Sequence, residues 1–413
     1  MAVFRPFKAF RPTPDKAKEV AAPPYDVLNS QEAREMVKGN PISFLHVGKP
    51  EIDLDPNLSP YDPAVYEKGK ENLQKLITDG YLVEDPEPYI YLYAQTMDGR
   101  TQYGLVGCAS AKDYHDDVIK KHEKTRQVKE EDRCNHVRVT NAHSGPIFLT
   151  YRDVDAINEI VGQVKETTPD NDHTAEDGIR HTSWVIKDKQ LIERISAIMA
   201  DVDYFYVADG HHRSAAASIV AKERADADPN HNGDEEYNFF LAVLFPGSHL
   251  KILDYNRVCK DLNGNSEEDI LAKLGEIFEV KVSEDQFKPS KKGDIGMYLG
   301  GKWYSLTAPQ RFLDNTDPVE VLDVAILQRE VLTPLLGIDD PRTSERIDFV
   351  GGIRGLGELE KRVNSGEMAI AFAMYPTSVD ELMSIADAGK IMSPKSTWFE
   401  PKLRDGLFVH FLD

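Results

Sequence analysis

Hydrophobic positions along the chain follow two periods, one typical of strands and the other of helices. Runs rich in aromatic and β-branched residues indicate strands, as at residues 89–95, 101–109 and 238–245. The last run is unbroken and apolar, which is typical of a buried central strand. Between these runs, apolar residues recur at helical spacing, for example over residues 62–78. The alternation predicts an α/β protein with mixed α+β features.

Residues typical of turns and helix caps predict further secondary-structure elements. Asp98-Gly99 lies between two β-rich runs and predicts a hairpin. Residues 41–47 are expected to form a short strand, and residues 317–332 a helix. A polar segment at residues 261–265 suggests a boundary. We therefore expect an N-terminal α/β region over residues 1–115, a central region over 116–262, and a C-terminal α+β domain over 263–413.

Composition narrows the functional classes. The chain has 413 residues, 41% hydrophobic and 29% charged, with a formal net charge of −21. This charge argues against a nucleic-acid-binding surface, although a local basic pocket could still bind a phosphorylated small molecule. Three scattered cysteines fit a reducing cytoplasm. The sequence shows no signal-peptide pattern and no apolar run near the length of a membrane helix, so we expect a cytoplasmic protein without a membrane partner.

One stretch combines a strand, a turn and a helix start. An apolar run from Tyr204 ends in Asp209-Gly210, and alanine-rich helical sequence follows. Glycine permits close approach of a ligand, and the first N–H groups of a helix can seat an anion. Arg213 could grip a phosphate or carboxylate with two hydrogen bonds. The alternative is structural, with Asp209 as a helix cap and one of the histidines His211 and His212 only packing.

Two other segments carry candidate chemistry. Residues 118–133 place His122, Glu123 and several cations directly after an apolar run. This pattern is typical either of a solvated helix face or of a loop that presents Glu123 to a phosphorylated ligand. Near the other end, Lys395-Ser396-Thr397 resembles a fragment of a phosphate loop without its glycines, framed by two prolines. A surface loop is the plainer interpretation.

Brought together, these residues suit phosphoryl transfer, which needs a carboxylate to take a proton and cations at the phosphates, usually with Mg²⁺. A zinc hydrolase using Asp209, His211 and His212 is a rival, although three nearly contiguous ligands would coordinate awkwardly. The sequence has no HExxH, GxSxG, Walker A or GxGxxG motif.

The chain as a whole resembles the bacterial domain-of-unknown-function 1015 family. Six segments carry the resemblance and together span nearly all of the chain: Ala22–Val27, Asn40–Val47, His122–Thr125, Ala208–Arg213, Tyr255–Arg257 and Pro394–Lys402.

A narrower resemblance concerns His122-Glu123 and Asp209–Arg213, which are similar to motifs of the ParB/sulfiredoxin-like superfamily and its free serine kinases. This resemblance implies a ParB-like central domain over residues 116–262 that binds nucleotide and substrate, and in which Glu123 is the catalytic base. Asp209 would position the acceptor hydroxyl or help to hold Mg²⁺. Phosphate and substrate contacts are expected from His122, Thr125, Arg126, Gly210, His211, His212, Arg213, Asn256, Arg257, Lys395, Ser396, Thr397 and Lys402.

The leading hypothesis is a kinase that moves a phosphoryl group from ATP or ADP to a small hydroxylated metabolite, with free L-serine as one candidate. The insert between the two motifs is longer than in the compact serine kinases. A regulatory protein that binds nucleotide without transfer, as ParB proteins bind CTP, is therefore the alternative. A metal-dependent hydrolase ranks third.

Overall fold

A computed structural model describes residues 2–413, which form two compact units. The first unit contains the residues up to Lys121, residues 125–250 and residues 401–413, and the second contains residues 251–400 together with 122–124. Helices and strands occur in both units, which confirms the mixed α/β class. The division differs from three consecutive regions because residues 401–413 return to the first unit, where β21 (His410–Phe411) pairs with β7 (Ala142–His143).

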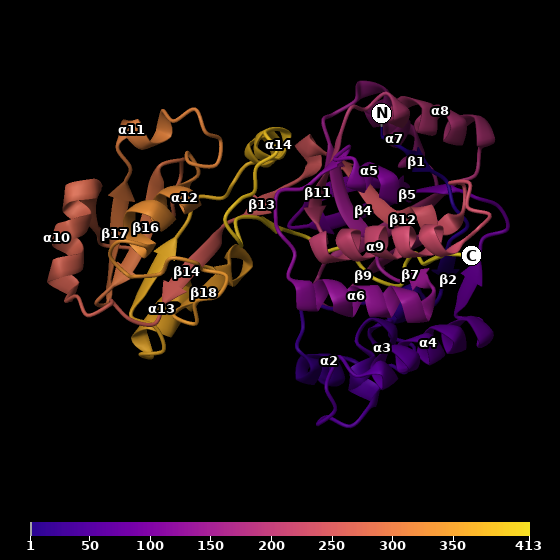
Figure 1. Cartoon of the computed structure of the whole chain (residues 1–413), viewed down its shortest axis with the longest axis horizontal. Helices are drawn as coiled ribbons and strands as arrows, with labels where there is room; N and C mark the ends of the chain where they lie inside the picture. The colour runs from indigo at the N-terminus through magenta and orange to yellow at the C-terminus, as the bar shows by residue number, and fades with distance from the viewer. Residues whose placement is uncertain (1) are drawn as a thin grey trace. The chain divides into compact units, whose positions relative to one another are not determined.

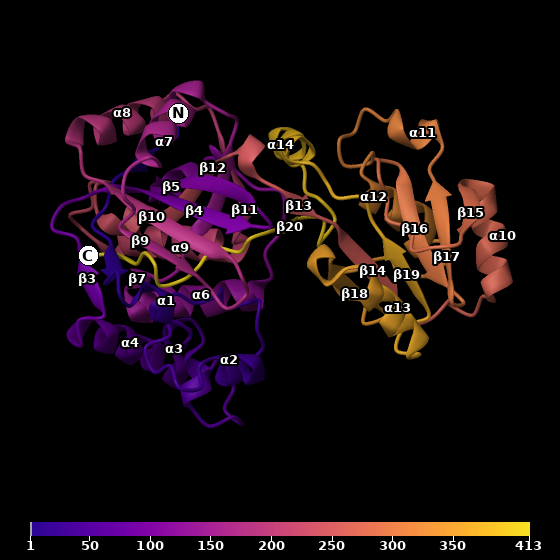
Figure 2. The ribbon, with the colours of Figure 1, turned by 180° about the vertical axis from the view of Figure 1, so that it is seen from behind.

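The first unit is built on a nine-stranded sheet, seen from its two sides in Figures 1 and 2. Its order is β6-β11-β8-β12-β5-β4-β10-β9, with β1 paired to β5. The strands are β1 (Phe4–Arg5), β4 (Ile90–Met97), β5 (Arg100–Ser110), β6 (Ile119–Lys120), β8 (Ile147–Tyr151), β9 (Asn171–Thr174), β10 (Arg180–Ile186), β11 (Phe205–Asp209) and β12 (Phe239–Pro246). Strands β6 and β11 run parallel, as do β8 and β12.

Two sequence signals for this sheet are confirmed. Every residue of β12 is buried, as its unbroken apolar run predicts. The turn between β4 and β5 holds Asp98 at φ 52° and Gly99 at φ 77°. Both residues are in the left-handed region, which Asp-Gly turns of hairpins adopt readily. A smaller pair, β2 (Phe10–Pro12) with β3 (Leu82–Glu84), completes the strands of this unit.

Helices α7 and α8 pack their apolar residues into the main core of the sheet, and α6 lies beside α9 (Figure 1). Small residues dominate the buried face of α9, among them Ala216, Ala217 and Ala221, which lets this helix approach its neighbours closely. The helices are α1 (Ala17–Val20), α2 (Ser30–Met36), α3 (Leu45–Gly48), η1 (Pro50–Asp53), α4 (Pro63–Thr78), α5 (Ala111–His115), α6 (Gln127–Thr140), α7 (Asp155–Val164), α8 (Lys189–Ala200), α9 (His211–Ala227), η2 (Glu236–Asn238) and η3 (Gly247–His249).

The second unit has a six-stranded sheet in the order β15-β17-β16-β19-β14-β18. Residues of α10 and α12 pack on one face, and residues of α13 pack on the other. The strands are β13 (Ile252–Leu253), β14 (Tyr255–Cys259), β15 (Glu279–Ser283), β16 (Asp294–Leu299), β17 (Lys302–Thr307), β18 (Ile347–Gly351), β19 (Ile370–Ala373) and β20 (Trp398–Phe399), where β13 pairs only with β20. The helices are α10 (Glu267–Ile277), α11 (Gln310–Leu313), α12 (Asp323–Leu327), η4 (Gln328–Leu332), η5 (Gly352–Arg354), α13 (Leu356–Asn364) and α14 (Val379–Asp387).

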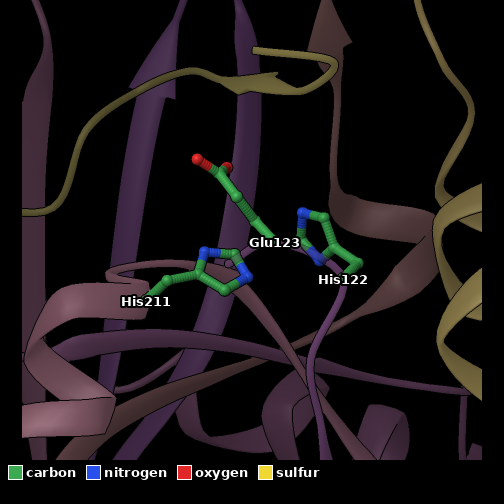
Figure 3. Close-up of side chains that lie close together, drawn as sticks. All are labelled: His122, Glu123 and His211. Atoms are coloured by element: carbon green, nitrogen blue, oxygen red, sulfur yellow. The ribbon is translucent and has the colours of Figure 1, made fainter. Parts of the chain in front are cut away.

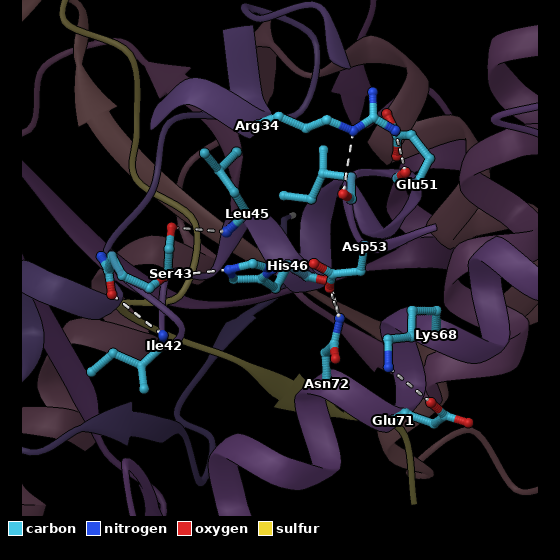
Figure 4. A network of polar contacts seen from close by, with 12 residues as sticks. Arg34, Ile42, Ser43, Leu45, His46, Glu51, Asp53, Lys68, Glu71 and Asn72 are labelled. Atoms are coloured by element: carbon cyan, nitrogen blue, oxygen red, sulfur yellow. Dashed lines mark hydrogen bonds and ion pairs between the residues drawn. The ribbon is translucent and has the colours of Figure 1, made fainter. Parts of the chain in front are cut away.

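The strand expected at residues 41–47 is wrong, since this segment forms a turn followed by α3. Polar groups hold it in place (Figure 4). The Ser43 hydroxyl accepts the N–H of Leu45, and His46 Nδ1 lies 2.8 Å from an Asp53 carboxylate oxygen. The hydrogen bond with Asp53 raises the pKa of His46. His46, which belongs to a family motif, is therefore a structural residue.

The helix expected over residues 317–332 is confirmed only in its second half. The regular helix α12 begins at Asp323 and continues as a π-helical turn, η4, to Leu332. None of the helices between Ala2 and Asp413 combines the length and the hydropathy that a bilayer-spanning segment requires.

Candidate functional site

The predicted strand–turn–helix is present at β11 and α9. Strand β11 ends at Asp209, Gly210 has φ 90° and ψ 32°, and α9 begins at His211. A Cβ at Gly210 would meet no atom closer than 3.7 Å, so it is the left-handed φ rather than lack of space that favours glycine. The first N–H groups of α9 have no intrahelical carbonyl partner and form a seat for negative charge.

Asp209 is anchored at this turn. One carboxylate oxygen accepts the N–H of Gly210 at 2.9 Å, and the other lies 2.9 Å from Lys402 Nζ. Burial alone would raise the pKa of Asp209, but the Lys402 ammonium outweighs burial, and the pKa is lowered. Asp209 is therefore ionised and its charge is compensated within the first unit.

Mg²⁺ at Asp209, expected from the sequence, fits these residues poorly. Mg²⁺ takes six oxygen ligands in near-octahedral geometry. An ammonium ion directly on Asp209 competes with such an ion for the same oxygen, because Lys402 already supplies the positive charge.

The two histidines of the turn have different environments. His211 is buried, and burial lowers its pKa to about 4, so its ring is neutral at pH 7. The Nε2 atom of His212 accepts the backbone N–H of Arg126 at 3.1 Å. An accepting Nε2 places the His212 proton on Nδ1. This bond ties the segment after Glu123 to the first turn of α9.

Arg213 lies where the phosphate contact is predicted, but its two Nη atoms each donate to Asp405 at 2.7 Å. The carboxylate raises the pKa of Arg213 despite burial. Gly145 makes room for this pair, because a Cβ there would lie 1.9 Å from Arg213 Nη1 and 2.2 Å from Asp405. In place of the predicted contact with a phosphate, Arg213 forms a two-point ion pair with Asp405, which we call the clasp.

Tyr25, from the Pro-Pro-Tyr-Asp motif, supports the clasp. Its ring centroid lies 3.9 Å from the Arg133 guanidinium carbon and 5.3 Å from that of Arg213. Both arginines also line a small cavity of about 30 Å³, whose walls include His136 and His143. No local sequence pattern indicates that Asp405 and Gly145 lie against Arg213, or that Arg133 lies at the same tyrosine ring.

Glu123 and His122 lie close to the start of α9 (Figure 3). One candidate ligand atom from each of His122, Glu123 and His211 lies within 4.8 Å of the other two. The covalent chain supports this placement from both sides. Before His122, β6 pairs with β11 in the register Lys120↔Tyr206, and after Glu123 the Arg126 N–H bonds to His212.

Four further predicted residues have defined neighbours. Thr125 donates its hydroxyl to Glu130 at 2.7 Å. In the second unit, Asn256 donates to Asp254 and accepts the N–H of Met374, so its amide has a structural role. Ser396 donates to the Ser393 carbonyl at 2.6 Å. Within the same unit, Thr397 Oγ1 lies 3.4 Å from His122 Nε2.

The comparisons with known proteins give one family and several remote structures. The family model described as "Protein of unknown function (DUF1015)" matches residues 4–325. No curated protein matches the chain significantly.

Three solved structures illustrate the remote similarity. A conserved hypothetical protein from Pyrococcus furiosus has 16% identity over 71% of this chain and 93% of its own, with a TM-score of 0.33. A free serine kinase in complex with AMP has 15% identity over 68% of this chain and 84% of its own, with a TM-score of 0.33. SbnI with a C-terminal truncation, from Staphylococcus aureus, has 10% identity over 74% and 87%, with a TM-score of 0.39. Since the family model spans most of the sequence, the chain belongs to the DUF1015 family.

Proposed function

We propose that the protein is a nucleotide-dependent phosphotransferase that acts on a small hydroxylated metabolite, with free L-serine as the first acceptor to test. The observation that carries the proposal is the position of Glu123 beside the first turn of α9. Phosphoryl transfer requires a base for the attacking hydroxyl and fixed positive electrostatics for the phosphates. In this proposal Glu123 supplies the base, and the start of α9 supplies the positive electrostatics.

Glu123 is suited to the role of base. Within residues 2–413 its carboxylate forms no ion pair, whereas Asp209 is tied to Lys402. A carboxylate without a permanent cation can accept the proton of a hydroxyl that is placed within hydrogen-bond distance. We assign proton abstraction to Glu123, and to Asp209 with Lys402 the positioning of the turn that carries His211.

The start of α9 is the proposed seat for phosphate oxygens. The helix spans 17 residues, and its first turn combines N–H donors with the positive end of the helix dipole. His211 adds a neutral ring at the same place. In this scheme Arg213 acts indirectly, because its clasp on Asp405 orients the first turn of α9.

A direct test incubates the purified full chain with ATP, ADP or CTP and a pool of hydroxylated metabolites that includes L-serine, followed by ³¹P NMR and mass spectrometry. We expect a phosphomonoester from the wild type. Glu123→Gln and Glu123→Ala are expected to lose turnover by at least about 100-fold, the usual scale for a general base, while nucleotide binding survives. Glu131→Gln, on the exposed side of α6, is the matched control.

Two outcomes would contradict the proposal. Tight nucleotide binding without any phosphorylated product supports the regulatory alternative. A Glu123→Gln variant with the wild-type rate removes Glu123 from the role of base.

A metal-dependent hydrolase is a second candidate, because the side chains in Figure 3 form a different set from the one considered in the sequence. Two histidines and a glutamate are a recurrent ligand set of catalytic zinc. Elemental analysis of the purified chain separates the candidates. Stoichiometric zinc that is lost in both His211→Ala and Glu123→Gln favours the hydrolase, whereas metal-free protein with transfer activity favours the kinase.

A further inference from the structure

Arg257 differs from every other deeply buried arginine of the described chain. Two arginines between Ala2 and Asp413 are buried, Arg404 with 6% exposure and Arg257 with 3%. Arg404 forms an ion pair with Asp177. Arg257 has no carboxylate partner among the described residues: its hydrogen bonds go to backbone carbonyl groups, and its guanidinium carbon lies 5.6 Å from the centroid of the Phe349 ring. Since buried charges are normally paired, the second unit carries an uncompensated cation.

Some N–H donors of the Arg257 guanidinium remain available to hydrogen-bond a ligand. Its Nη1 donates to the Tyr255 carbonyl and its Nη2 to the Lys395 carbonyl, the latter at 3.1 Å. A guanidinium has five N–H donors, so three are left after these two bonds. Burial lowers the pKa of Arg257 to about 10, still well above neutrality. The group is thus a fixed positive charge at pH 7.

A second cation without an acidic partner lies on the turn that contacts Arg257. Lys395 has φ +58°, a left-handed backbone that residues with a side chain rarely adopt. Its Nζ lies 5.8 Å from the centroid of the Tyr255 ring, and no ion pair involves it within the described residues. The turn is pinned by two side-chain bonds, from Ser396 to the Ser393 carbonyl and from Thr377 to the Ser396 carbonyl.

We propose that Arg257 and the turn over residues 393–397 form an oxyanion site of the second unit, specific for the phosphate group of a phosphorylated small molecule. Two cations without acidic partners call for about two negative charges. A phosphomonoester carries about −1.5 to −2 at pH 7 and a carboxylate only one. Arginine forks match phosphate oxygens bidentately, and lysine adds a point charge. The site is independent of the proposed transfer reaction.

The test measures binding of inorganic phosphate and pyrophosphate to the full chain by calorimetry, with acetate as the competitor of single charge. We expect Lys395→Gly to weaken binding by at least about tenfold while the fold is kept, because glycine favours the left-handed backbone. Arg257→Lys, which keeps the charge but loses the fork, is expected to weaken binding to a similar degree. Lys302→Ala, an exposed lysine of β17 in the same unit, is expected to bind like the wild type.

Three results would overturn the proposal: no binding of either ion to the wild type, unchanged binding in Lys395→Gly, or displacement by acetate at concentrations equal to those of phosphate. If Arg257→Lys does not fold, Lys395→Gly alone decides the matter. Because no acceptor or nucleotide is present, absence of transferase activity does not affect this result.

Discussion

Arg213 in the first unit is largely shielded from solvent and Arg257 in the second is buried, yet their surroundings are opposite. Arg213 donates two hydrogen bonds to the Asp405 carboxylate, and Arg257 donates two to backbone carbonyls. A guanidinium that is already neutralised by a carboxylate has a structural role, because loss of either partner leaves the other charge uncompensated. A guanidinium that lacks a counter-charge is suited to bind an anionic ligand. The two arginines therefore illustrate a structural role and a proposed binding role within one chain.

The source of the neutralising charge explains the difference. Asp405 belongs to residues 401–413, which return to the first unit after the whole second unit has been completed. The same segment supplies Lys402 to Asp209. This short return therefore fixes both charged groups of the β11–α9 turn, whereas Arg257 receives no such partner.

The largest effect is expected from Asp405→Asn, which would leave the largely shielded Arg213 guanidinium without its anion. Removal of one member of a buried ion pair costs about 3–5 kcal/mol. Urea unfolding of the first unit should show a loss of this size. Asp348→Asn, which removes an exposed partner of Arg362, should leave the midpoint unchanged. An equally small effect of Asp405→Asn would show that the clasp does not hold the fold.

A smaller loss is expected from Gly145→Ala, which keeps both charges but pushes them apart. The new methyl group would overlap Arg213 Nη1, and overpacking of this kind costs about 1–3 kcal/mol. Gly162→Ala is the matched control, because a Cβ there on α7 meets nothing within 4 Å. Equal stability of the two variants would contradict the close fit at Gly145.

Acid should affect the two units with opposite sign. Burial lowers the pKa of His136 to about 3 and of His181 to about 2, below the value of 6.5 in an unfolded chain. The unfolded first unit therefore takes up protons first as pH falls below 6.5, and its stability decreases. Burial raises the pKa of Asp323 to about 7. The folded second unit then binds the extra proton between pH 7 and 4, and its stability increases as pH falls.

Hydrogen exchange read by mass spectrometry at pH 7 and pH 5, corrected for intrinsic rates, would report each unit separately. A group that titrates differently in the folded and unfolded states across this window changes the free energy of unfolding by about 1–3 kcal/mol. Asp323→Asn should remove the gain in the second unit and leave the first unit unaffected. Protection that falls equally in both units would contradict the assignment.

The smallest effect on stability is expected from Lys395→Gly, which relieves a left-handed backbone. The expected gain is at most about 1–2 kcal/mol, visible as a small rise in the thermal midpoint. Loss of phosphate affinity together with this gain would sharpen the contrast with Arg213. A marked fall in the midpoint would instead show that the Lys395 side chain is structural.

Local turns of the fold could be predicted from the sequence, whereas contacts between residues far apart in the sequence could not. The Asp98-Gly99 hairpin and the left-handed Gly210 follow from backbone preferences of adjacent residues. The strand expected at residues 41–47 failed because side-chain bonds such as the one between His46 and Asp53 favour a compact turn over a strand. Asp405 lies 192 positions from Arg213, and no local pattern links the two. The sequence motif therefore singles out Arg213, but whether its guanidinium binds a ligand or forms an internal ion pair depends on the distant residue Asp405.

The measurement that bears most directly on the central claim is ³¹P NMR of the full chain with nucleotide and L-serine, comparing the wild type with Glu123→Gln. We expect a new phosphomonoester signal from the wild type and its loss from the variant, with nucleotide still bound. A product signal of equal intensity from both proteins would contradict the assignment of Glu123 as the base.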